Sequence, residues 1–204
     1  MQDLRSRAGT MLNGTGSGML AMSVFTPFYA IWPVFAWPVL GVVIFVAALA
    51  WSVYLGLTAR RLLRLSAGLP DERNEYDARI TQGMRVLSSG QGGLIALAAV
   101  TLWLLGLQVW ILPVVALIVA LHFFPMAAMF GRTLDYYLGT MMAIASLAGF
   151  TLAGLGWLWQ AVWATTGIGG GIVTSIYGLH MVRTARRTLA EYQALVAADR
   201  TERE

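Results

Sequence analysis

The chain has 204 residues, of which 58% are hydrophobic and only 12% are charged, with a formal net charge of +4. A soluble domain carries about 25% charged residues, so this composition argues against one and indicates a membrane protein. All 14 basic residues are Arg and Cys is absent, which excludes Schiff-base lysines, a P-loop, disulfides and thiolate metal sites.

Three stretches contain no charged residue: 8–59, 86–131 and 136–182. Each is about 50 residues long and one membrane-crossing helix needs about 20, so each stretch fits two helices and a short turn. The sequence therefore predicts an all-α fold, a single transmembrane domain of six helices in three hairpins. The predicted spans are 13–33, 37–59, 86–106, 109–130, 136–156 and 160–182.

Charge and tryptophan predict the same orientation. Every Arg lies beside one end of these hairpins, and the positive-inside rule places that end, with both termini, in the cytoplasm of a bacterial inner membrane. The opposite turns are uncharged and carry an aromatic belt, formed by Trp32, Trp37, Trp103, Trp110, Trp157, Trp159 and Trp163. Because Arg suits anionic headgroups, the predicted partners are membrane lipids and not nucleic acid.

The even-numbered helices end in similar strings. The second helix ends Ser52-Val53-Tyr54-Leu55-Gly56-Leu57-Thr58, and the sixth ends Ser175-Ile176-Tyr177-Gly178-Leu179-His180. In the fourth helix, Ala120-Leu121-His122 lies at the corresponding place, with His122 matching Thr58 and His180. This similarity is typical of a threefold parallel repeat of hairpins. Chance similarity between helices rich in Ala, Leu and Gly explains it equally well.

Two polar segments flank the spans. Segment 66–85 has helical spacing of its apolar residues and is predicted to be an amphipathic cytoplasmic helix that runs into the third span. Segment 183–204 has a similar pattern and is either a surface or subunit-binding helix or a solvated extension of the sixth helix. Thr133 and Asp135 are predicted to cap the fifth helix.

No carboxylate or Arg lies within a predicted span, which disfavours carboxylate proton relays and acid/base catalysis. We therefore predict no enzyme activity and no cofactor or metal. His122 lies deep in the fourth span, three residues before Pro125, which frees a backbone carbonyl. It is either a binding residue or a structural hydrogen-bonding residue, whereas His180 is predicted to lie at the membrane interface.

Small residues mark three helices. Ser88-Ser89-Gly90 and Gly92-Gly93 flank Gln91 at the start of the third span, where Gln91 either binds a polar solute group or belongs to a close helix crossing. The fifth and sixth helices carry small residues at intervals of four, a pattern whose usual meaning is tight helix contact. These residues are Ala145, Gly149, Ala153, Thr166, Gly170, Thr174 and Gly178.

The run Ala120 to Ala127, with His122 and Pro125, and the pair Tyr136-Tyr137 resemble a group of bacterial multi-pass membrane proteins of similar size. That group has a His-Phe-x-Pro-x-Ala run followed by Tyr-Tyr and is functionally uncharacterised. The resemblance covers about the central third of the chain and implies a six-helix architecture but no activity. The group often carries an acidic residue where Gln91 stands here, so a charge-dependent role is in doubt.

Two functions are consistent with these features. The first is a small transporter or channel-like protein for a neutral or weakly polar solute, with a cavity lined by Gln91, His122, Ser52 and Thr58. The second is a non-catalytic accessory or scaffold subunit, either a homo-oligomer or part of a larger membrane complex. A wet cavity that reaches His122 would favour transport, and a filled core with an apolar outer face would favour a subunit.

Overall fold

The computed structural model describes residues 2–68 and 75–201, and side chains from 9 to 68, from 82 to 194 and at 197. In the described residues the fold is all-α without a strand, which confirms the predicted fold class. The elements are α1 (Gln2–Ala30), α2 (Pro33–Ala36), α3 (Pro38–Ser66), α4 (Glu75–Leu104), the 3-10 helix η1 (Gln108–Trp110), α5 (Ile111–Phe130), α6 (Thr133–Gly154) and α7 (Trp159–Thr201).

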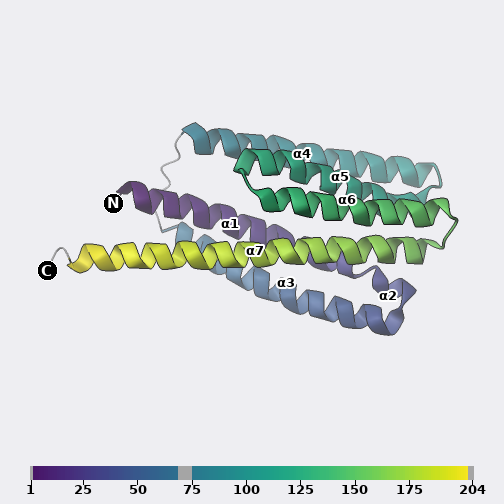
Figure 1. Cartoon of the computed structure of the whole chain (residues 1–204), viewed down its shortest axis with the longest axis horizontal. Helices are drawn as coiled ribbons and strands as arrows, with labels where there is room; N and C mark the ends of the chain where they lie inside the picture. Colours follow the sequence, from purple (N-terminus) through teal and green to yellow (C-terminus); the bar gives the residue numbers. More distant parts are fainter. Residues whose placement is uncertain (1, 69–74, 202–204) are drawn as a thin grey trace.

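The six long helices lie side by side along one direction, and both chain ends lie at the same end of the bundle (Figure 1). Three turns lie at the opposite end: α1 to α3 through α2, α4 to α5 through η1, and α6 to α7. Gly106 and Gly156 lie in two of these turns with φ of +73° and +76°, a left-handed backbone that favours glycine. In the third turn, Pro33 and Pro38 begin α2 and α3, where the missing N–H costs little.

Five segments are long and apolar enough to cross a membrane, and we therefore treat the chain as an integral membrane protein. These segments are Gly9–Ala36, Pro38–Ser66, Gln82–Leu104, Gln108–Phe130 and Thr133–Gly154. The predicted sixth span, 160–182, is the uncharged first half of α7 and is not among the five. It is rich in Gly and Thr, which lower its hydropathy, but α7 still runs the whole length of the bundle (Figure 1).

The predicted polar segments belong to longer helices. The amphipathic segment 66–85 includes residues 69–74, which lie outside the described residues, and from Glu75 it forms the first turns of α4. The C-terminal segment continues α7 without a break to Thr201, as the extension alternative predicts. Ala185 and Thr188 on this extension are buried, so its first turns still pack in the bundle.

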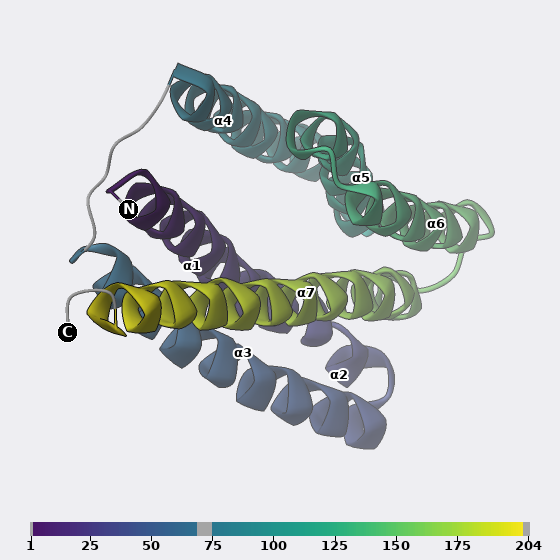
Figure 2. The ribbon, with the colours of Figure 1, turned by 60° about the vertical axis from the view of Figure 1, so that its left-hand side comes forward.

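The helix α7 is central and α4 is peripheral. α7 packs against α1, α2, α3, α5 and α6, while α4 packs along α5 and η1 at the edge (Figure 2). Buried apolar side chains fill the centre, and in the described residues none of the fully buried ones comes from α4. The largest are Leu12, Met19, Tyr29, Leu55, Leu62, Leu112, Leu138, Met142, Val162 and Val173.

The tryptophan-rich turns meet at the end opposite the termini. The rings of Trp32 and Trp163 meet edge to face with their centroids 4.5 Å apart, and Trp163 Nε1 donates a hydrogen bond of 3.0 Å to the carbonyl of Val109. Trp163 also meets Trp159 at 5.4 Å. The predicted aromatic belt therefore contributes to tertiary contacts between all three hairpins.

Candidate functional site

The four residues predicted to line one cavity lie on separate parts of the bundle. Ser52 and Thr58 are on α3, Gln91 is on α4 and His122 is on α5. α3 and α4 lie on opposite sides, with α1 and α7 between them (Figure 2). The structure therefore does not bring these four side chains together.

Individually, the four residues differ in how their polar groups are used. Thr58 Oγ1 donates a hydrogen bond of 2.8 Å to the carbonyl of Tyr54 in its own helix, an ordinary arrangement for Thr in a helix. Ser52 is buried, and its Oγ has no hydrogen-bond partner among the described residues. His122 is half-buried, and its buried Nδ1 likewise has no partner there. Gln91 is partly exposed at the edge of the bundle.

A polar cluster that the sequence analysis missed lies where α6 begins. The prediction that Thr133 and Asp135 cap this helix is wrong: Arg132 occupies the capping position, and no side chain caps the first turn. Asp135 is instead fully buried, and its Oδ2 accepts a hydrogen bond of 3.0 Å from Arg132 Nε. Asp135 lies in the first turn of the candidate membrane segment Thr133–Gly154, one residue before the predicted span 136–156.

Arg132 connects this carboxylate to the central helix. Its Nη2 donates a hydrogen bond of 2.8 Å to the hydroxyl of Tyr177 on α7. The guanidinium also lies 4.4 Å from the ring centroid of Phe130, a cation–π contact. Phe123 on α5 meets the Tyr177 ring edge to face at 5.7 Å. The cluster therefore joins the end of α5, the start of α6 and the middle of α7.

Burial makes this ion pair costly to break. A buried carboxylate is tolerated when it is paired and hydrogen-bonded, and removing one partner leaves an uncompensated charge. The Arg132 side chain is 31% exposed, so one end of the pair reaches the surface. The other carboxylate oxygen, Asp135 Oδ1, is buried without a hydrogen-bond partner in the described residues. His180 lies one turn after Tyr177, close enough to interact electrostatically with both charges.

The sequence contained a weak signal for this cluster. Arg132 and Asp135 have the i,i+3 spacing of a helical ion pair, although the predicted span began one residue after Asp135. Tyr177 also occupies the position that matches Tyr54 in the similar strings. Both tyrosine hydroxyls accept a hydrogen bond from an Arg, Tyr54 from Arg186 at 3.1 Å. Neither pairing could be read from the sequence, because each joins residues far apart in the chain.

The edge of the bundle has an open, mainly apolar groove of about 440 Å³ between α4 and α5. It is lined by Gln82, Gly83, Val86, Leu87, Pro125 and Met129. His122 is not among these residues, although Pro125 lies only three positions after it. Among the described residues, no three His, Asp or Glu side chains are grouped so that they could hold a metal ion.

The chain matches no family model, no curated protein and no solved structure. The resemblance based on the His122 run therefore stays a prediction.

Proposed function

We propose that the protein is a non-catalytic subunit or scaffold of the bacterial inner membrane that binds a neighbouring transmembrane helix along α4. The observation that carries this proposal is that the apolar part of α4 is not buried by the rest of the bundle. In the most apolar 18-residue window of α4, no residue is buried. In the corresponding window of the segment that contains α5, 44% of the residues are buried. In this proposal both termini lie in the cytoplasm, as the Arg distribution predicts.

The composition of α4 suits a helix partner better than lipid. Around Gln91, a Cβ added at Gly90, Gly92 or Gly93 would meet nothing within 4 Å. Small residues allow another backbone to approach closely, and a Gln amide in hydrocarbon gains from a hydrogen-bond partner on a second helix. The Gln91 side chain makes no hydrogen bond to another described residue. A lipid-facing helix needs neither feature.

The filled centre of the bundle supports a subunit over a transporter. Transport of a neutral solute needs a cavity that connects polar groups such as His122, Gln91 and Ser52. Buried side chains such as Met142, Leu55 and Val173 instead occupy the interior. The groove described above is open to the side of the bundle, at the same edge as α4.

Site-specific crosslinking tests the proposal, because the chain has no Cys and a single introduced Cys is unique. Gly93→Cys on α4 and Ala50→Cys on α3, an exposed small residue on the opposite side, would each carry a maleimide photocrosslinker in native membranes. We expect a discrete protein adduct from position 93 and none from position 50.

A further substitution separates specific contact from chance proximity. Adding Gly90→Leu to the Gly93→Cys protein should abolish the adduct, because a leucine side chain would fill the close approach, while the thermal stability of the protein stays unchanged. Equal adducts from positions 93 and 50, or no adduct from either, would contradict the proposal.

A further inference from the structure

Six Arg side chains lie on two neighbouring helices near the end of the bundle that carries the termini. All six are exposed, and none forms an ion pair with another described residue. They are Arg60, Arg61 and Arg64 on α3, and Arg183, Arg186 and Arg187 on α7. Glu191, also exposed, is the one acidic side chain described on α7. Among the side chains that the structure describes, this junction therefore has an excess of positive charge.

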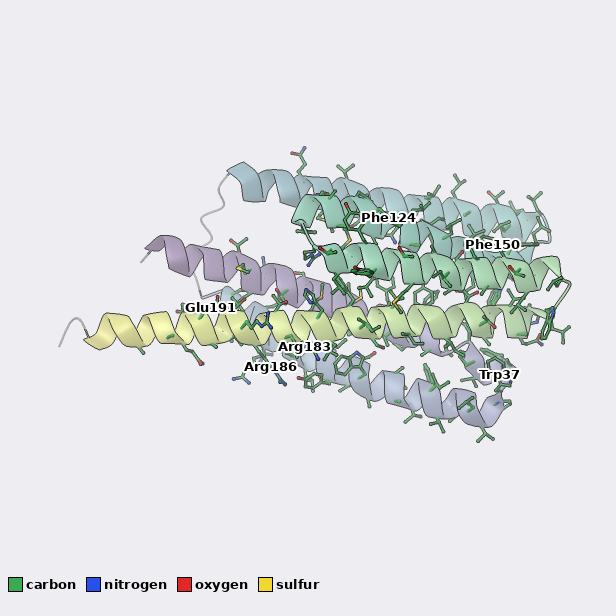
Figure 3. All side chains as sticks on the ribbon, in the orientation of Figure 1. Trp37, Phe124, Phe150, Arg183, Arg186 and Glu191 are labelled. Atoms are coloured by element: carbon green, nitrogen blue, oxygen red, sulfur yellow. The ribbon has the colours of Figure 1, made fainter. Side chains whose placement is uncertain are left out.

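The contact between the two helices brings these charges onto one surface. Leu55 and Trp51 of α3 lie against Gly178 of α7, where an added Cβ would be 2.8 Å from Leu55. Further along, Arg186 Nη2 donates a hydrogen bond of 3.1 Å to the Tyr54 hydroxyl. Figure 3 shows Arg183 and Arg186 on the part of α7 beside α3.

Helical spacing places three Arg residues on one face of this junction. Arg61 lies seven residues after Tyr54, which is two helical turns along the same face of α3. Arg183 lies one turn before Arg186 on α7, again on the same face. The Tyr54 ring is fixed by stacking on Trp51, with centroids 5.4 Å apart, so its hydroxyl holds Arg186 in a defined place.

The same face continues into exposed apolar side chains. Leu57 on α3 is 63% exposed, and Ile176 and Leu179 on α7 precede the Arg residues by one or two turns. These residues lie towards the middle of the bundle, where acyl chains would contact them, and the guanidinium groups lie beyond them. An apolar surface that ends in clustered Arg has the chemistry of a phospholipid, with tails against Leu and Ile and a phosphate against Arg.

We propose that Arg61, Arg183 and Arg186, with Tyr54 as a positioning residue, bind the headgroup of an anionic phospholipid at the junction of α3 and α7. Guanidinium groups donate paired hydrogen bonds to phosphate oxygens, and these charge-assisted bonds are about twice as strong as neutral ones. The Tyr54 hydroxyl accepts from Arg186 and keeps its own proton for a phosphate oxygen. This site is separate from the face of α4 in the proposed function.

The test measures phospholipid retained by the purified protein in native mass spectrometry, after exchange into phosphatidylcholine vesicles with and without phosphatidylglycerol. We expect the unmodified protein to retain phosphatidylglycerol selectively. Arg186→Gln should weaken this retention about tenfold, which corresponds to one charge-assisted hydrogen bond. The matched control is Arg85→Gln, which removes an exposed Arg from α4 and should leave retention unchanged.

Two further arms separate a built site from general surface charge. Tyr54→Phe keeps every charge but frees Arg186, and it should weaken retention about threefold, less than the loss of a guanidinium because the charges remain. An equal effect of Arg85→Gln and Arg186→Gln, or no effect of Tyr54→Phe, would overturn the site. Displacement of the lipid by inorganic phosphate alone would overturn the assignment to a lipid. Thermal unfolding of each variant checks that it is folded.

Discussion

Helices α4 and α7 carry the same kind of residues in opposite surroundings. Gly90, Gly92 and Gly93 on α4 have open space where a Cβ would be. On α7, a Cβ at Gly170 would overlap the ring of Tyr29, and one at Gly178 would lie 2.8 Å from Leu55. Glycine in a membrane helix therefore marks a close approach that already exists in α7 and, in our proposal, one that a partner completes in α4.

The comparison also explains why α7 is not among the apolar spans. A helix that touches lipid on most of its circumference needs aliphatic side chains, whereas a helix surrounded by other helices needs small ones. Val162, Ala164 and Thr166 in the first half of α7 are fully buried. Protein replaces lipid around α7, so its hydropathy is lower although it runs through the whole bundle.

The largest expected effect comes from filling a close approach on α7. Gly167→Leu would force a side chain against the Tyr29 carbonyl and against Trp32 Cβ, 3.2 Å from the added Cβ. We expect the free energy of unfolding to fall by about 3 kcal/mol or more, because backbone cannot move aside as a flexible side chain can. Thermal unfolding in detergent measures this loss of stability. The matched control is Gly93→Leu on α4, where an added Cβ meets nothing within 4 Å. Similar losses of stability in both variants would contradict the difference in packing between α7 and α4.

A smaller effect is expected from the Arg132–Asp135 ion pair at the start of α6, whose Arg also hydrogen-bonds Tyr177 on α7. Asp135→Asn keeps the size of the side chain but leaves Arg132 without its counter-charge. The expected loss is about 2 kcal/mol, below the usual range for buried pairs because Arg132 is 31% exposed. Chemical denaturation would measure it, with Gln91→Ala on α4 as the control that should change stability by less than about 0.5 kcal/mol. If Asp135→Asn left the free energy of unfolding unchanged, the cluster would not stabilise the bundle.

The smallest effect concerns a single buried hydroxyl. Ser146 Oγ on α6 donates a hydrogen bond of 2.8 Å to the carbonyl of Pro113 on α5. Ser146→Ala should cost about 1 kcal/mol, since it removes a buried hydrogen bond between two helices. Ser89 on α4 donates only within its own helix, at 2.7 Å to the carbonyl of Arg85. Ser89→Ala should therefore leave the free energy of unfolding unchanged. A larger loss of stability from Ser89→Ala than from Ser146→Ala would contradict the contrast between α4 and the buried helices.

Much of the fold could be predicted because it follows from local sequence. Long uncharged stretches must be helical in lipid, and proline and glycine mark turns such as those at Pro38 and Gly156. The candidate site could not be predicted in the same way. Asp135 looks like a helix cap by its position alone, and only the neighbouring α7 provides Tyr177 to complete the Arg132 cluster.

The cavity expected around His122 shows the same limit. The sequence places polar residues on α3, α4 and α5, but their distance depends on the order in which the helices pack. α3 and α4 are on opposite sides because α1 and α7, the first and last helices of the chain, lie between them (Figure 2).

The sequence by itself determined the helices, their turns and the separation of Arg from Trp, because each depends on the preference of a short segment for lipid, water or the interface. The tertiary structure alone decided which helix is central, which glycines are in contact and where a carboxylate is buried. Those properties depend on contacts between segments far apart in the chain. The small side chains that α4 and α7 share are compatible with a helix at the edge of the bundle and with one at its centre.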